Sequence, residues 1–105
     1  MPQFILLCRD KPGAAGLRQE TRPDHLAYIK SAGEKVRLAG PMLDKEGGPD
    51  SAPTGSMLII EAADQAEADA FAKADPYARA GLFEEVRVIP YRLVAGALLS
   101  RPNDK

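Results

Sequence analysis

Residues 4–8, Phe4-Ile5-Leu6-Leu7-Cys8, form a continuous apolar run that stops at charged residues 9–11 and a Pro-Gly pair. A run of this length, bounded by charge and by a turn signal, predicts a buried β-strand. The run Met57-Leu58-Ile59-Ile60 predicts another, within residues 56–61. Neither run contains proline, whereas the other two predicted strands, residues 35–43 and 83–94, contain Pro41 and Pro90. Because proline cannot donate a hydrogen bond within a sheet, we expect the first two strands in the centre and the last two at the edges.

The first of two predicted helices follows a loop over residues 10–20, which is rich in glycine and proline. Thr21 can cap its first turn, Asp24 three residues on completes a capping-box pattern, and Gly33 provides the stop. We therefore expect a helix from Thr21 to about residue 32, with His25 in its first turn.

The second predicted helix begins with another capping pair, Asp64 and Glu67. Pro76 disfavours helical geometry at Asp75, so we expect this helix to end or kink there. Its expected apolar face consists of Ala66, Ala70, Phe71 and Ala74.

The order of elements is therefore βαββαβ, the ferredoxin-like arrangement of an α+β domain, with an antiparallel sheet in the order 4-1-3-2. Two helices cover only one face of such a sheet, yet both central runs are apolar at every position and hence on both faces. The uncovered face needs a partner, and a second copy related by a two-fold axis supplies one. We expect a homodimer whose two sheets pack face to face.

The chain of 105 residues predicts one domain, residues 1–100, and a flexible tail, residues 101–105. The 14 Lys and Arg residues and 15 Asp and Glu residues give a net charge of −1 without a basic cluster, so we expect neither nucleic acid nor a membrane as a partner. A single cysteine, Cys8, excludes an internal disulfide, and no signal peptide is recognisable, so we expect a cytoplasmic protein. One histidine and one cysteine do not make a typical zinc site, and phosphate-binding glycine motifs are absent, so we expect no metal and no cofactor.

His25, the only histidine, is the first candidate for chemistry because imidazole changes charge near neutral pH. Asp75 can orient that imidazole and stabilise its protonated form if the fold brings the two together. In the alternative, His25 makes only a local hydrogen bond, and Asp75 caps the turn that begins at Pro76. The two roles of Asp75 can coexist, one carboxylate oxygen serving each.

Three further residues are candidates for binding a substrate. Arg22, three positions before His25, can hold a carboxylate or phenolate, or it can be a solvated surface cation. Ser56 can line a pocket or complete a turn, and no nucleophile elbow surrounds it. Tyr77 can offer its hydroxyl or ring to a ligand, or it can be a packing residue.

Short motifs spread over residues 4–91 have a characteristic order and spacing. They are Arg22-Pro23-Asp24-His25-Leu26-Ala27-Tyr28, Ala39-Gly40-Pro41-Met42, Gly55-Ser56, Glu61-Ala62, Ala74-Asp75-Pro76-Tyr77 and Gly81-Leu82-Phe83. Together they resemble the YciI-like (YCII-related) family. The resemblance implies a dimeric α+β barrel of ferredoxin-like halves and an active-site His-Asp pair, at His25 and Asp75 here. It also implies lyase-type chemistry, since dehydrochlorination of chlorinated, hydroxylated aromatics is attributed to some members.

Two hypotheses on function follow. In the first, the protein is a small cofactor-independent enzyme, a lyase or isomerase, in which His25 and Asp75 move a proton on a small aromatic or enol-bearing substrate. Arg22, Ser56 and Tyr77 hold that substrate. In the alternative, the protein is a non-catalytic dimeric module that binds a small ligand through the same residues or has an accessory role. A catalytic base gives a pH-dependent rate, whereas an anchor need not.

Overall fold

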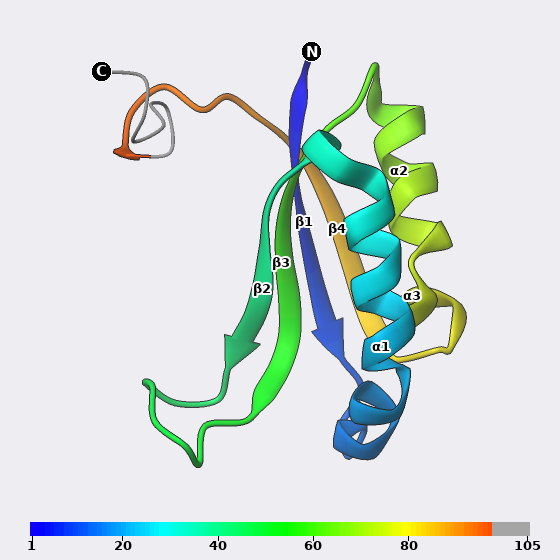
Figure 1. Cartoon of the computed structure of the whole chain (residues 1–105), viewed down its shortest axis with the longest axis vertical. Helices are drawn as coiled ribbons and strands as arrows, with labels where there is room; N and C mark the ends of the chain where they lie inside the picture. The colour runs from blue at the N-terminus through cyan, green and yellow to red at the C-terminus, as the bar shows by residue number, and fades with distance from the viewer. Residues whose placement is uncertain (98–105) are drawn as a thin grey trace.

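The computed structural model describes residues 1–97, which contain a four-stranded antiparallel sheet with helices along one face (Figure 1). The predicted tail, residues 101–105, and residues 98–100 of the predicted domain lie outside the described residues. No helix within residues 1–97 is long and apolar enough to cross a membrane. The elements in chain order are β1 (Gln3–Asp10), α1 (Ala15–Ala32), the 3₁₀ turn η1 (Gly33–Lys35), β2 (Val36–Leu43), β3 (Pro53–Glu61), α2 (Gln65–Ala74), α3 (Pro76–Arg79) and β4 (Phe83–Tyr91).

The strands lie in the order β2-β3-β1-β4, which confirms the predicted order 4-1-3-2 and the α+β class. Pro41 and Pro90 lie on the two edge strands, β2 and β4, where a missing N–H is tolerated. The association of two copies into a dimeric barrel stays a prediction.

Alternate residues of β1 and β3 face the helices and form the core. They make three cross-strand pairs, Phe4 with Ile60, Leu6 with Leu58 and Cys8 with Ser56. All six are buried, and Ala68 and Ala72 of α2 belong to the same cluster as the apolar members. The first two of these pairs are apolar on both strands, whereas the third contains the polar side chain of Ser56.

The helix α1 begins at Ala15, so the predicted start at Thr21 and the predicted loop over residues 10–20 are wrong. His25 therefore lies inside the helix, not in its first turn. Pro23 lies inside this helix and has no N–H to donate to the carbonyl group of Gln19, four residues earlier. Both residues are exposed, so water can bind that carbonyl group and the helix tolerates the proline. No side chain caps the first turn; instead, Arg18 ties that end of the helix to β1 and β3. The predicted end at Gly33 is correct, and its φ of 61° is a conformation that glycine adopts without strain.

The helix α2 begins as predicted but packs with a different face. The Asp64 carboxylate accepts a hydrogen bond from the backbone N–H of Glu67, and the Glu67 carboxylate accepts one from the N–H of Ala63. The expected face of Ala66, Ala70, Phe71 and Ala74 is wrong, because the three alanines are exposed and only Phe71 is half-buried. Alanine occurs on every side of this helix, so the apolar pattern does not specify one face.

The opposite face of the sheet carries no helix in the described part of the chain (Figure 1). Side chains alternate across a strand, so Ile5 and Leu7 of β1 point to this face together with their cross-strand neighbours. These neighbours are the apolar Met57, Ile59 and Ile89 and the charged Arg87. This uncovered apolar face is what the uniformly apolar central strands predicted.

Candidate active site

His25 and Asp75 are separated by fifty residues in the sequence and meet between α1 and the start of α3. His25 Nδ1 lies 2.9 Å from Asp75 Oδ1 and 3.0 Å from Oδ2, and the two side chains are only 10% and 7% exposed. Because an ionised carboxylate can only accept, Nδ1–H donates to Asp75. In the neutral ring, Nε2 then carries the lone pair and can accept a proton.

Asp75 also caps the short helix α3. Its Oδ1 accepts a hydrogen bond of 2.9 Å from the backbone N–H of Tyr77, and Pro76 occupies the first helical position. The two roles proposed from the sequence therefore coexist, although Oδ1 serves both. The cap holds the carboxylate still, which in turn fixes the orientation of the His25 ring.

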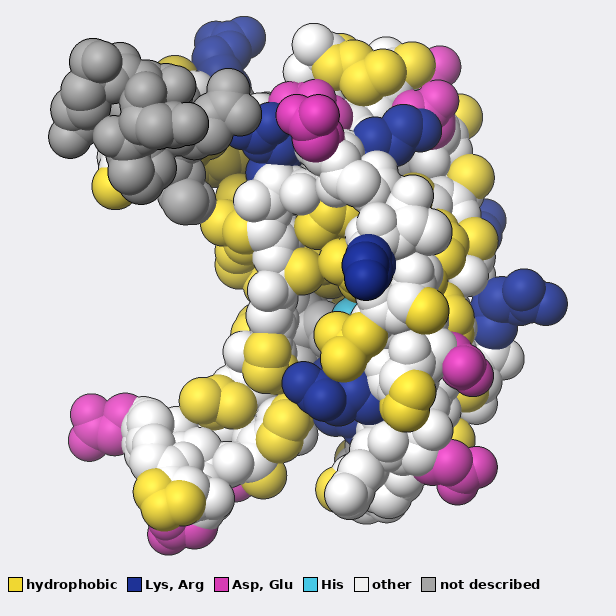
Figure 2. Space-filling model, viewed as in Figure 1, with side chains coloured by type: hydrophobic (Ala, Val, Ile, Leu, Met, Phe, Trp, Pro, Cys, Tyr) yellow, Lys and Arg dark blue, Asp and Glu magenta, His cyan; other side chains and the backbone are white. Residues whose placement is uncertain are grey.

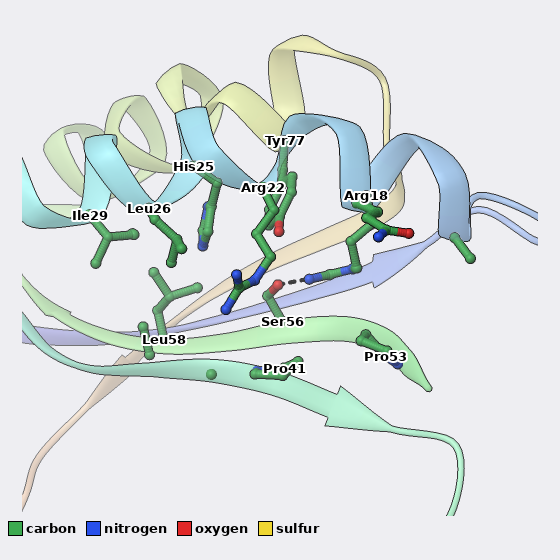
Figure 3. A pocket seen from close by; sticks show the side chains of 14 residues that line it. Arg18, Arg22, His25, Leu26, Ile29, Pro41, Pro53, Ser56, Leu58 and Tyr77 are labelled. Atoms are coloured by element: carbon green, nitrogen blue, oxygen red, sulfur yellow. Dashed lines mark hydrogen bonds between the residues drawn. The ribbon is translucent and has the colours of Figure 1, made fainter. Parts of the chain in front are cut away.

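Tyr77 separates His25 from Arg18. Its ring stacks on the His25 ring, with centroids 4.0 Å apart and 17° between the planes. The guanidinium carbon of Arg18 lies 4.6 Å from the centre of the Tyr77 ring, on the face that His25 leaves free (Figure 3). Tyr77 is 1% exposed, so its ring is a structural spacer, and its hydroxyl points towards the cavity (Figure 3).

Arg18 is held on its other side by Asp10, at the end of β1, and by Ser56 of β3. Arg18 Nε and Nη2 donate to the two Asp10 carboxylate oxygens at 2.7 and 2.9 Å. Nη2 also donates to Ser56 Oγ at 2.8 Å, and all three groups are buried. A bidentate pair of this kind fixes the plane and position of the guanidinium group.

A cavity of about 490 Å³ lies between α1 and strands β2 and β3, and Arg18, His25, Ser56 and Tyr77 line it (Figure 3). The space-filling view shows the hollow, with the histidine at its bottom and basic and apolar side chains at its rim (Figure 2). Its walls combine apolar side chains with a few polar groups, as is typical of sites for small molecules. The principal lining residues are Arg18, Arg22, His25, Leu26, Pro41, Ser56, Leu58 and Tyr77.

Arg22 differs from Arg18 because no carboxylate among the described residues pairs with it. Within residues 1–97 it forms no ion pair, and its side chain reaches from α1 towards β2 and β3 (Figure 3). Arg18, in contrast, is neutralised by Asp10. Arg22 is therefore the cation of this cavity that is available to a mobile anion.

Burial governs the protonation of several groups around the cavity. Burial raises the pKa of Tyr77 despite the opposing charges of Arg18 and Arg22, so its hydroxyl remains a proton donor at neutral pH. Burial by itself would lower the pKa of Arg18, but its hydrogen bond and ion pair with Asp10 outweigh burial and raise it. Burial and the charge of Asp75 raise the pKa of Cys8 to about 12, so this thiol is a packing group and not a nucleophile.

All five residues selected from the sequence are near this cavity: Arg22, His25, Ser56 and Tyr77 line it, and Asp75 contacts His25. Arg18 and Asp10 were missed because residues 10–20 were interpreted as a loop. The available signal was spacing, since Arg18, Arg22 and His25 follow each other at intervals of four and three, which places them on one helical face. No three His, Cys, Asp or Glu side chains within residues 1–97 are grouped as metal ligands.

Comparisons with known proteins agree with this architecture. The family model described as YCII-related domain matches residues 2–92. The protein YciI of Escherichia coli O6:H1 is 36% identical over 95 residues, which are 87% of this chain and 97% of that protein. An uncharacterized protein of Haemophilus influenzae is 32% identical over the same proportions. Among solved structures, 5-chloro-2-hydroxyhydroquinone dehydrochlorinase from Burkholderia phenoliruptrix AC1100, in complex with 2,5-dihydroxybenzoquinone, is 35% identical with a TM-score of 0.78, covering 90% of this chain and 95% of that one.

Proposed function

This chain belongs to the family of YCII-related domains, and from that membership we propose that it is a small enzyme that works by acid–base catalysis at His25 and Asp75. One observation carries the proposal: the hydrogen bond of 2.9 Å between these two buried residues lies beside a cavity of about 490 Å³. A cavity of this volume accommodates a single substituted ring.

In the proposed reaction, His25 Nε2 takes a proton from an acidic group of the substrate. Asp75 stabilises the resulting imidazolium through the Nδ1–H hydrogen bond, and it keeps the ring in the tautomer that exposes Nε2. His25 later returns the proton to the product or to water. Because this chemistry consists of proton transfers, it suits an elimination or an isomerisation.

A small hydroxylated aromatic acid is the proposed substrate class. The 35% identical dehydrochlorinase supports it, and so does the free Arg22 guanidinium above the cavity, which can bind a carboxylate or phenolate. The hydroxyl groups of Ser56 and Tyr77 supply hydrogen bonds to oxygen atoms on the ring. If the reaction is a dehydrochlorination, the substrate loses a proton to His25 and chloride to solvent.

We also propose that the protein acts as a homodimer. The uncovered face of the sheet presents the partly exposed side chains of Ile5, Leu7, Met57 and Ile89, and packing against the same face of a second copy would remove them from water. Replacing Ile5 with lysine puts a charge at the centre of this face, so we expect the variant to elute as a monomer in size-exclusion chromatography with light scattering. A wild-type protein that is monomeric at micromolar concentration would contradict the proposal.

The deciding experiment measures chloride release and ring absorbance with a panel of hydroxylated aromatics that includes 5-chloro-2-hydroxyhydroquinone. We expect His25→Ala to lower kcat by at least about 100-fold, since a general base contributes this much or more. Lys30→Ala, an exposed substitution on the same helix, is the matched control and should leave the rate unchanged. Full activity of His25→Ala would refute the proposed base, and tight binding without turnover by the wild type would favour the alternative, a ligand-binding module.

A further inference from the structure

Ser56 has a hydrogen-bond donor that no acceptor in the described part of the chain uses. Its Oγ accepts a hydrogen bond of 2.8 Å from Arg18 Nη2, and within residues 1–97 its hydroxyl donates to no acceptor. A serine hydroxyl has one donor hydrogen, and Ser56 is 3% exposed while it lines the cavity. The structure thus places a buried donor in the wall of the cavity that a ligand would fill.

Arg18 cannot turn away from Ser56. Both Asp10 carboxylate oxygens hold its Nε and Nη2, and the Tyr77 ring covers one face of the guanidinium group. An arginine has no acceptor atom, so Ser56 must accept in this contact and can donate only elsewhere. Asp10 therefore acts indirectly, by holding Arg18 in place.

Resting on the proposed function, we propose that Ser56, polarised by Arg18, is a subsite for a negatively charged or carbonyl oxygen of the substrate. Arg18 is a positioning residue in this scheme, because it acts through Ser56. A donor that already accepts from a cation gives a stronger hydrogen bond to an anion than a free serine does.

The subsite also restricts how a substrate lies. The His25 ring and the Arg18 guanidinium carbon lie 4.0 Å and 4.6 Å from the centre of the Tyr77 ring, which stands between them. His25 and the Ser56 hydroxyl that Arg18 holds are therefore separate parts of the cavity lining. The substrate would then present its acidic group to His25 and an acceptor oxygen, from the other side of its ring, to Ser56.

The test uses 2,5-dihydroxybenzoquinone as the probe, because its ionisation changes its visible absorbance and its binding requires no turnover. Calorimetry and absorbance titration across the pH range give both the affinity and the pKa of the bound probe. We expect Ser56→Ala to weaken binding of the anion by about 10-fold to 100-fold and to raise the pKa of the bound probe. Ser56→Thr keeps the hydroxyl and is the matched control, with binding close to that of the wild type.

Arg18→Lys tests the indirect role. It keeps a positive charge near Asp10 but removes the rigid fork that reaches Ser56. We expect it to weaken probe binding in the wild-type background and to add little in the Ser56→Ala background, since Arg18 acts through the missing hydroxyl. A purely structural loss would be the same in both backgrounds and would contradict the coupling.

The outcomes separate the subsite from the proposed function. Binding that is unchanged by Ser56→Ala at every pH would overturn the subsite and leave the His25 chemistry standing. Failure of the wild type to bind the probe would overturn both the subsite and the proposed substrate class. The expected loss in Ser56→Ala, in a protein that turns over none of the aromatics, would support the subsite while refuting the enzyme.

Discussion

The helix-covered face of the sheet has an apolar end and a polar end, and both are built on the same strands. Along β1, Phe4 and Leu6 face α2 in an ordinary core, whereas Asp10, at the far end of the same row, pairs with Arg18. Along β3, Ile60 belongs to the core alone, Leu58 belongs to the core and also lines the cavity, and Ser56 is the polar residue of the cavity wall.

The two ends place different physical demands on the residues that form them. Burial of aliphatic side chains is non-directional and tolerates variation in shape. Buried ions need specific partners at specific distances, because each charge that loses its partner is left in a medium that solvates it poorly. The apolar end should therefore respond to changes in volume and the polar end to changes in pairing.

The largest expected effect is at the polar end. Arg18→Leu leaves the Asp10 carboxylate buried without its partner, and breaking a buried ion pair in this way costs about 3–5 kcal/mol. Urea denaturation followed by circular dichroism measures the loss. Adding Asp10→Asn should recover part of it, and a loss below about 1 kcal/mol would show that Asp10 reaches solvent instead.

Leu6→Ala tests the apolar end. The Leu6 side chain is 2% exposed and belongs to the core, so its removal leaves a cavity, and we expect the free energy of unfolding to fall by about 3 kcal/mol. The same denaturation experiment applies. Leu6→Met, which nearly conserves volume, should cost less than about 1.5 kcal/mol, and equal losses for the two variants would contradict a closely packed apolar end.

Cys8 lies between the apolar end and the polar end, and its burial makes the stability of the protein depend on pH. Burial raises the pKa of its thiol from 9.0 to about 12. The unfolded chain therefore loses this proton first, so the stability due to Cys8 is complete below about pH 9 and declines between about pH 9 and 12, by at most about 1.4 kcal/mol per pH unit. Unfolding free energies measured from about pH 8 to 10.5 should fall more steeply for the wild type than for Cys8→Ala, and identical slopes would show that the thiol titrates freely in the folded protein.

The smallest expected loss of stability is at Asp64, one of two aspartates that cap helices; the other is Asp75. Asp64→Ala removes only an exposed cap on α2, so we expect a loss of about 1 kcal/mol in stability and no change in kcat. Asp75→Asn keeps a capping oxygen for the Tyr77 N–H but removes the charge beside His25, so kcat should fall much more than stability. Steady-state kinetics and denaturation of both variants give this contrast, which would fail if Asp64→Ala impaired turnover as strongly.

Much of the fold was predictable because its signals are local. The two apolar runs identify the central strands, Pro41 and Pro90 identify the edges, and Gly33 and Asp64 mark helix ends, each through the conformation of a few neighbouring residues. The start of α1 was not predictable in this way. Thr21 and Pro23 form a plausible local start, and the contacts of Arg18 with β1 and with the distant strand β3 override it.

The candidate site likewise has features that the local sequence indicates and features that depend on long-range contacts. The sequence by itself determined which side chains could do chemistry, since His25 is the only histidine and Asp75 stands before a proline at a helix break. Only the tertiary structure decided that these two residues share a hydrogen bond across fifty positions, and that Arg18 and Asp10 support Ser56. The physical reason is that capping and periodicity depend on neighbours along the chain, whereas a buried ion pair depends on which strand ends the sheet brings beside which turn of a helix.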